Sequence, residues 1–126
     1  MKIYGVTGCK NTGKTGLIER LVKEFVIRGV TVSTIKHAHH DTDIDQPGRD
    51  SHRHREAGAH QVVLSTKNRW AVMTELRDSP EADLKSIIRS LEPVQLTLIE
   101  GYKNDPHPKI ETFRLAISKP LLALTN

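Results

Sequence analysis

Hydrophobic residues near the start of the chain change from a short run to a helical period. The apolar segment Ile3–Thr7 has the length of a strand and leads directly into a stretch containing two glycines. Beyond Lys14, apolar residues recur every three to four positions, which predicts an amphipathic helix. This stripe consists of Leu17, Ile18, Leu21, Val22, Phe25 and Val26. Gly29 is placed to end the helix in a left-handed conformation, and the β-branched run Val30–Ile35 predicts a second strand.

The middle of the chain predicts shorter elements. Asp50 or Ser51 is expected to cap a short basic helix that ends near Gly58. The segments Gln61–Ser65 and Trp70–Met73 predict two strands that pair antiparallel around a tight turn.

The last third again alternates between helix and strand. Ser79–Glu81 is a helix-start signal, with a serine cap followed by proline in the first helical position. The apolar face of that helix would consist of Leu84, Ile87, Ile88 and Leu91. Leu96–Ile99 predicts a buried strand, and Ile110–Ile117 predicts one more.

This alternation predicts an α/β fold: a P-loop NTPase-like, mostly parallel sheet flanked by helices, with an antiparallel hairpin. Two parallel strands joined by a helix are expected to lie side by side, as we predict for Ile3–Thr7 and Val30–Ile35. We expect one domain over residues 1–126.

Composition narrows the classes of partner. The 126 residues are 37% hydrophobic and 27% charged, with a formal net charge of +4 and a pI near 9.4. The basic balance favours anionic partners, while only 4% aromatic residues argues against a base-stacking surface for nucleic acid. No apolar run approaches the ~20 residues of a membrane-spanning helix. The single cysteine, Cys9, suits a reducing compartment, so we expect a cytoplasmic protein.

The strongest chemical signal is the glycine-containing stretch. Gly8–Thr15 satisfies the pattern G-x-x-x-x-G-K-[S/T] between a predicted strand and a predicted helix, which is the context that a phosphate-binding loop requires. Its glycines let successive N–H groups point into one concavity, at the positive end of the helix. Lys14 is expected to reach the β- and γ-phosphates, and the Thr15 hydroxyl to ligate Mg²⁺. The expected nucleotide-binding residues are Gly8, Cys9, Lys10, Asn11, Thr12, Gly13, Lys14, Thr15 and Gly16.

Two of these residues have alternative interpretations. Cys9 is either a reactive thiol near a helix start or a small residue that fills the loop. Lys10 either adds positive charge over the phosphates or is a solvated surface lysine.

A carboxylate ends the later buried strand. In a P-loop protein, a strand beside the first one presents such a group to Mg²⁺ or to its water shell, and Glu100 is placed for this role. We assign Lys14 and Glu100 as the catalytic candidates and Thr15 and Glu100 as the metal candidates. Gly101 would let a backbone N–H approach the γ-phosphate.

The polar stretch of residues 36–48 is rich in histidine and aspartate, and it follows the second strand, where ligands bind in α/β folds. His37, His39 and His40 are expected to contact nucleotide, Mg²⁺ or a second anionic substrate. A transition-metal site and a solvated loop are the alternatives. A cationic cluster follows, and it is either a solvated helix face or a site for a phosphate or an acidic partner: Arg49, His52, Arg53, His54 and Arg55.

Taken together, these segments resemble the molybdopterin-guanine dinucleotide biosynthesis protein B (MobB) family. The resemblance extends along essentially the whole chain in order and spacing, through Gly8–Thr15, Ile35–Asp41, Asp45–Ser51, Arg53–Ala59 and Ile99–Lys103. It implies a cytoplasmic, usually dimeric GTP-binding protein that uses Mg²⁺ and hydrolyses GTP weakly. Its partner would be the nucleotidyltransferase that attaches GMP to molybdopterin.

The chain departs from the expected pattern in several ways. Gly16 stands where a threonine often follows the loop, and no Asn-Lys-x-Asp guanine-reading motif occurs. Relatives usually continue beyond the segment that corresponds to Leu121–Asn126, so we expect this protein to be shorter than they are at its C-terminus. Neither a water-positioning glutamine nor an arginine-finger motif is assignable, so we expect slow hydrolysis without a partner.

Three other functions remain open from the sequence. The first is a small-molecule kinase with Asp41, Asp43 or Asp45 as base. The second is a metal-delivery GTPase that uses the histidines of residues 36–48. The third is a binding module without turnover.

Overall fold

The computed structural model describes residues 1–38 and 49–114. These residues fall into two compact units, and the boundaries lie near residue 39 and between residues 87 and 88. The first unit contains both ends of the described chain, and the second contains its middle. The expectation of one domain over residues 1–126 stays a prediction.

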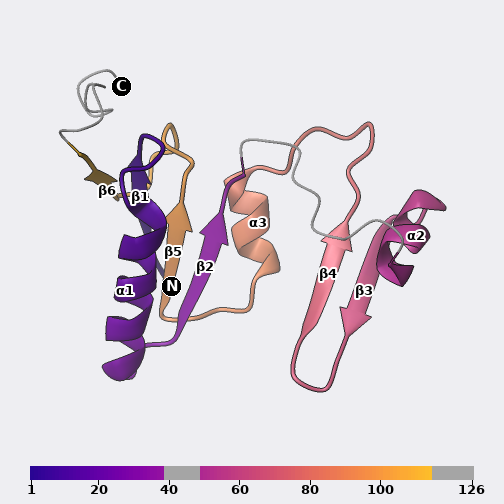
Figure 1. The fold of residues 1–126 in the computed structure, drawn as a ribbon, viewed down its shortest axis with the longest axis horizontal. Helices are drawn as coiled ribbons and strands as arrows, with labels where there is room; N and C mark the ends of the chain where they lie inside the picture. The colour runs from indigo at the N-terminus through magenta and orange to yellow at the C-terminus, as the bar shows by residue number, and fades with distance from the viewer. Residues whose placement is uncertain (39–48, 115–126) are drawn as a thin grey trace. The chain divides into compact units, whose positions relative to one another are not determined.

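The first unit is built on a four-stranded sheet. Its strands are β1 (Lys2–Gly8), β2 (Val32–Lys36), β5 (Leu96–Glu100) and β6 (Lys109–Thr112). They are arranged in the order β2-β5-β1-β6, and every neighbouring pair is parallel (Figure 1). The predicted mostly parallel sheet is therefore confirmed.

The predicted adjacency of the first two strands is wrong, because β5 lies between β1 and β2. The reason is burial. Thr97, Leu98 and Ile99 are at most 2% exposed, and a strand covered on both faces belongs in the middle of a sheet. The β2 strand carries Ser33 and Thr34 instead, with Thr34 exposed, which suits an edge position.

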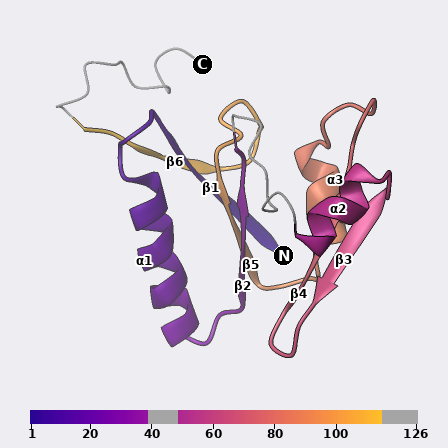
Figure 2. The same cartoon turned by 45° about the vertical axis from the view of Figure 1, so that its right-hand side comes forward.

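Helix α1 (Lys14–Ile27) contacts β1, β5 and β2 and lies along the sheet (Figure 2). Its end agrees with the sequence prediction, since Gly29 has φ 81°. The N–H of Gly29 donates to the carbonyl of Val26, and the N–H of Val30 donates to that of Phe25. This pair of bonds is a Schellman motif, which satisfies the last carbonyls of the helix.

The second unit contains α2 (Asp50–Glu56), β3 (Gln61–Ser65) and β4 (Trp70–Thr74). The two strands form the predicted antiparallel pair. The predicted cap of α2 is wrong: Arg49 occupies the N-cap position, and no side chain makes a capping hydrogen bond. Asp50 instead lies in the first turn, where its charge favours the positive end of the helix.

Helix α3 (Leu84–Ser90) begins later than predicted. The Ser79–Glu81 segment is not helical. Asp83 caps the helix, because its Oδ1 accepts a hydrogen bond from the N–H of Ser86 at 2.8 Å. Leu84 is buried and Ile87 and Ile88 are half-buried, in agreement with the predicted apolar face.

The predicted last strand, Ile110–Ile117, is confirmed only as far as Thr112, where β6 ends. Phe113 and Arg114 are not part of a strand, and residues 115–117 lie outside the described residues. Among residues 1–38 and 49–114, the helices lack the length and hydropathy needed to cross a lipid bilayer.

Candidate functional site

The glycine-rich loop lies between the end of β1 and the start of α1, as the motif requires. Three of its residues have positive φ: Gly8 at 147°, Asn11 at 64° and Gly13 at 89°. Gly13 is the N-cap of α1, and its carbonyl accepts the first helical hydrogen bond from Leu17 at 3.0 Å. A backbone that repeatedly enters the left-handed region curls tightly and turns its N–H groups inward.

Thr12 joins this curl to strand β6. Its hydroxyl donates to the carbonyl of Cys9 at 2.6 Å and lies 2.6 Å from the hydroxyl of Thr112 on β6. Thr12 is buried, although four neighbouring loop positions are exposed or half-buried. The loop is therefore attached to the outer strand of the sheet, and the sequence offers no local signal for this contact because Thr112 is distant along the chain.

The side chain of Lys14 reaches back from the end of the loop to its first residue. Its Nζ donates to the carbonyl of Gly8 at 2.9 Å, so the ammonium group lies close to the first residue of the motif. The first turn of α1 contains no acidic residue. The ammonium group of Lys14 and the positive end of the helix dipole thus lie close together, and the first turn of α1 supplies no negative side chain to offset them.

The carboxylate predicted to accompany the loop is in place. Because β5 pairs with β1, Glu100 lies opposite Val6, just before the loop begins. The Thr15 hydroxyl donates to Oε1 of Glu100 at 3.0 Å, and only 12% of the glutamate side chain is exposed. The Nζ of Lys36 on β2 is 4.0 Å from the same oxygen, a contact that the sequence analysis did not anticipate.

The Thr15–Glu100 pair fits a magnesium ion by its chemistry. Mg²⁺ prefers oxygen ligands, keeps several of its waters and usually takes one or two protein ligands beside phosphates. A hydroxyl and a carboxylate oxygen that meet from different elements are such a set. Within the described part of the chain, no group of three or more His, Cys, Asp or Glu residues is arranged to hold a metal.

The expectation for Gly101 needs correction. Its N–H donates to the carbonyl of Val6 at 3.2 Å and so extends the β1–β5 ladder instead of pointing toward a phosphate. Gly101 has φ 100°, and a Cβ there would lie 3.0 Å from Cβ of His37. The glycine is thus required for the close approach of the chain after β2.

His37 lies beside this carboxylate region. Its N–H donates to the carbonyl of Glu100 at 2.9 Å, and its ring stacks on Tyr102 with 4.5 Å between ring centroids. The structure therefore brings His37 close to Glu100. His39 and His40 lie outside the described residues, as do Asp41, Asp43 and Asp45.

The other predicted loop residues differ in exposure. Lys10, Asn11, Thr15 and Gly16 are exposed, and Cys9 is half-buried. In the second unit, the cationic cluster is divided. Arg53 and His54 are exposed, whereas Nε of Arg55 is 3.6 Å from a carboxylate oxygen of Glu75.

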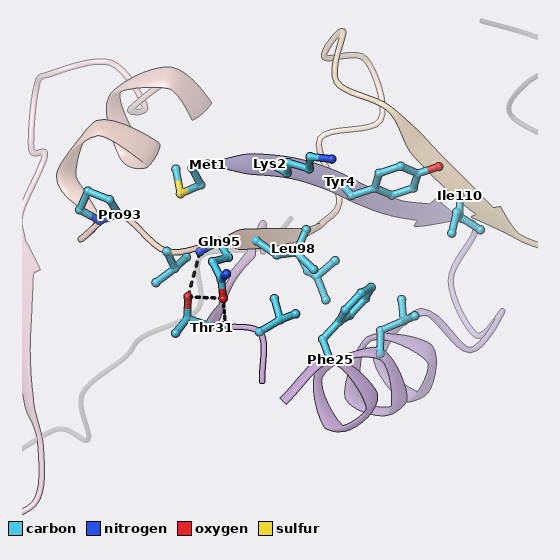
Figure 3. A pocket seen from close by; sticks show the side chains of 13 residues that line it. Met1, Lys2, Tyr4, Phe25, Thr31, Pro93, Gln95, Leu98 and Ile110 are labelled. Atoms are coloured by element: carbon cyan, nitrogen blue, oxygen red, sulfur yellow. Dashed lines mark hydrogen bonds between the residues drawn. The ribbon is translucent and has the colours of Figure 1, made fainter. Parts of the chain in front are cut away.

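A cavity of about 850 Å³ lies in the first unit, away from this loop (Figure 3). Its walls come from the second half of α1 and the starts of β1 and β5, including Leu21, Phe25, Tyr4 and Leu98. The lining is mainly apolar, and the described loop residues do not contribute to it. Because a triphosphate requires hydrogen-bond donors and cations, this cavity is not the predicted phosphate site.

Fold and loop together define the class: a mostly parallel α/β protein with a glycine-rich loop between its first strand and first helix. The family model for molybdopterin guanine dinucleotide synthesis protein B (MobB) matches residues 3–126. The chain therefore belongs to the MobB family.

Relatives and solved structures agree with this assignment. A molybdopterin-guanine dinucleotide biosynthesis adapter protein of Haemophilus influenzae is 41% identical over 119 residues, covering 94% of this chain and 67% of the relative. Its counterpart in Escherichia coli K12 is 42% identical over 105 residues, covering 82% and 60%. Bacillus subtilis MobB has a TM-score of 0.74 at 28% identity, covering 90% of this chain and 68% of that one. The MobB homologue of Bacillus stearothermophilus has a TM-score of 0.68 at 27% identity, covering 90% and 65%. This chain thus spans about two thirds of the length of these proteins.

Proposed function

We propose that this chain binds a guanine nucleoside triphosphate with Mg²⁺ at the glycine-rich loop and acts as an adapter in molybdopterin guanine dinucleotide synthesis. Family membership and the names of its relatives support the adapter role. The geometry of the loop supports the phosphate site. Guanine as the base comes from the family resemblance.

The observation that carries the phosphate site is the meeting of two contacts at one end of the sheet. The ammonium group of Lys14 lies at the carbonyl of Gly8, and the Thr15 hydroxyl lies at the carboxylate of Glu100. Adjacent residues of α1 thus supply a cation for phosphate and an oxygen for a metal ion. A glycine-rich turn with an incidental lysine would not require a carboxylate from a strand 85 residues away.

Each group has a definite task in this proposal. The inward N–H groups of the loop bind phosphate oxygens, and the helix N-terminus adds its positive end. Lys14 leaves the Gly8 carbonyl to pair with the phosphate chain, as a charge-assisted donor. Thr15 and Glu100 would hold Mg²⁺, which supplies neutralisation of phosphate charge.

We extend the proposal to turnover and partners. Glu100 is hydrogen-bonded to Thr15 and therefore serves the metal better than an attacking water. Hydrolysis is accordingly expected to be slow in the isolated protein. The partner protein would be the guanylyltransferase that attaches GMP to molybdopterin, and the chain would act as a homodimer.

Calorimetric titration with GTP, GDP and ATP, with Mg²⁺ and with EDTA, tests the nucleotide site. We expect Lys14→Ala to weaken triphosphate binding by roughly a hundredfold, because one charged contact is worth about 1.5–3 kcal/mol. Lys23→Ala is the matched control, since Lys23 is an exposed residue of the same helix that pairs with Glu19. Equal affinity of the wild type and Lys14→Ala would refute the proposed site. Stronger binding of ATP than GTP would refute the choice of base.

A further inference from the structure

A second cation, Arg114, lies at the start of α1. A Cβ placed on Gly13 would lie 3.3 Å from Nη2 of Arg114 and 4.0 Å from its Nε. The guanidinium group therefore rests against the residue that caps the helix and precedes Lys14. Gly13 permits this approach because it has no side chain.

The sheet explains why a residue so distant in sequence reaches the loop. Strand β6 runs parallel to β1 with Thr112 opposite Gly8, and the Thr112 hydroxyl contacts the hydroxyl of Thr12, a residue of the loop. Arg114 follows two residues after the end of β6 at Thr112. The register of β6 thus places the arginine beside the curl.

Two cations, Lys14 and Arg114, lie near the start of α1, where one carboxylate, that of Glu100, accepts a hydrogen bond from Thr15. Arg114 and Lys14 both lie at the positive end of the α1 dipole, and the first turn of the helix is without acidic residues. Within residues 1–38 and 49–114, the guanidinium group has neither a hydrogen bond nor an ion pair. Cations at a helix N-terminus repel its dipole, so this arrangement favours an anion between them.

We propose that Arg114 is a ligand-binding residue of the loop, which supplies a second cationic contact to the bound polyphosphate. This inference rests on the proposed phosphate site and adds a residue to it. The planar guanidinium group has donors spaced to bind two phosphate oxygens together, which an ammonium group does not offer. The arginine would come from the same chain, although no arginine-finger motif is visible in the sequence.

Titration of Arg114→Gln and Arg114→Lys with GTP and with inorganic tripolyphosphate, both with Mg²⁺, tests this inference. We expect Arg114→Gln to weaken both ligands about tenfold or more, and Arg114→Lys to weaken them less, because it keeps the charge but loses the fork. Arg28→Gln is the control, since it removes an equal charge at the far end of α1, where Arg28 pairs with Glu24. Unchanged affinity of Arg114→Gln would overturn the proposal.

Thermal melting without ligand separates binding from a structural role. If Arg114 serves to bind an anion, we expect the melting temperature of ligand-free Arg114→Gln to equal or exceed that of the wild type. The substitution removes a positive charge that is repelled by the positive end of the α1 dipole. A lower melting temperature would show that the arginine stabilises the fold, and would overturn the proposal.

The two ligands separate this inference from the proposed function. Binding of tripolyphosphate that depends on Arg114, without binding of GTP, would sustain the inference and refute the guanine nucleotide. Loss of GTP binding in Lys14→Ala but not in Arg114→Gln would sustain the function and refute the inference. Failure of the wild type to bind either ligand would refute both.

Discussion

At the scale of single residues, glycines decide the geometry of the loop. Gly8 has φ 147°, and a Cβ there would lie 2.4 Å from the hydroxyl oxygen of Thr112 and 2.7 Å from its carbonyl oxygen. Both the backbone conformation and the neighbouring strand therefore require glycine. Gly29 differs, because it has φ 81° but nothing within 4 Å of its would-be Cβ.

We expect Gly8→Ala to reduce the free energy of unfolding by about 2–4 kcal/mol, because backbone strain and overpacking against β6 add together. Gly29→Ala is expected to cost only about 1 kcal/mol, from strain alone. Urea unfolding followed by circular dichroism measures both. Equal losses in the two variants would show that contact with Thr112 contributes nothing.

At this scale, the positions of residues that are neighbours along the chain could be predicted from the motif. Lys14 and Thr15 are adjacent, so their helix places both at the loop from the motif alone. Thr112 and Arg114 were missed because their proximity to the loop depends on how β6 pairs with β1. A threonine and an arginine after a short strand have no pattern that identifies them.

At the scale of elements, the start of α3 shows that burial of an apolar side chain can outweigh a local helix-start signal. Ser79 followed by Pro80 is a strong start signal, yet α3 begins at Leu84 and its first turn is capped by Asp83. Ser79 and Asp83 both have side chains that can cap the N-terminus of a helix. The sequence contains two alternative starts, and burial of Leu84, which is 6% exposed, favours the second.

The cap assignment predicts different effects for the two residues. Asp83→Ala is expected to lower the free energy of unfolding by about 1 kcal/mol, because the N–H of Ser86 loses its acceptor. Ser79→Ala should change it by less than about 0.5 kcal/mol. Chemical denaturation provides the measurement, with Asp83→Asn as the control that keeps a capping oxygen. A larger loss in the serine variant would restore the original helix start.

At the scale of the whole molecule, pH reports on the loop between β5 and β6. His107 lies against Gly5 of β1, and neither of its ring nitrogens has a hydrogen-bond partner among the described residues. Burial, followed by the charge of Lys109, lowers the pKa of His107 from 6.5, although Asp105 opposes this shift. The folded protein therefore prefers the neutral ring.

The sign of the pH effect follows from that shift. Well above pH 6.5 His107 is neutral in both states, and its contribution to stability is complete. As the pH falls below this value, the unfolded chain binds a proton more readily than the folded one, and stability is lost down to the folded-state pKa. We expect the wild type to lose more stability than His107→Gln between pH 7.5 and 5.5, by urea unfolding. Parallel losses in both proteins would contradict the assignment.

Hydrophobic period, turn chemistry and the loop motif were sufficient for the α/β class, for most elements and for the position of the glycine-rich loop between strand and helix. These features depend on neighbours along the chain, and Gly8–Thr15 between strand and helix is the clearest case. Only the tertiary structure decided that β5 separates β1 from β2, that Gly101 uses its N–H within the sheet, and that Arg114 meets Gly13. Strand order and register depend on which strand is buried on both faces, and this competition is settled by the whole sheet at once.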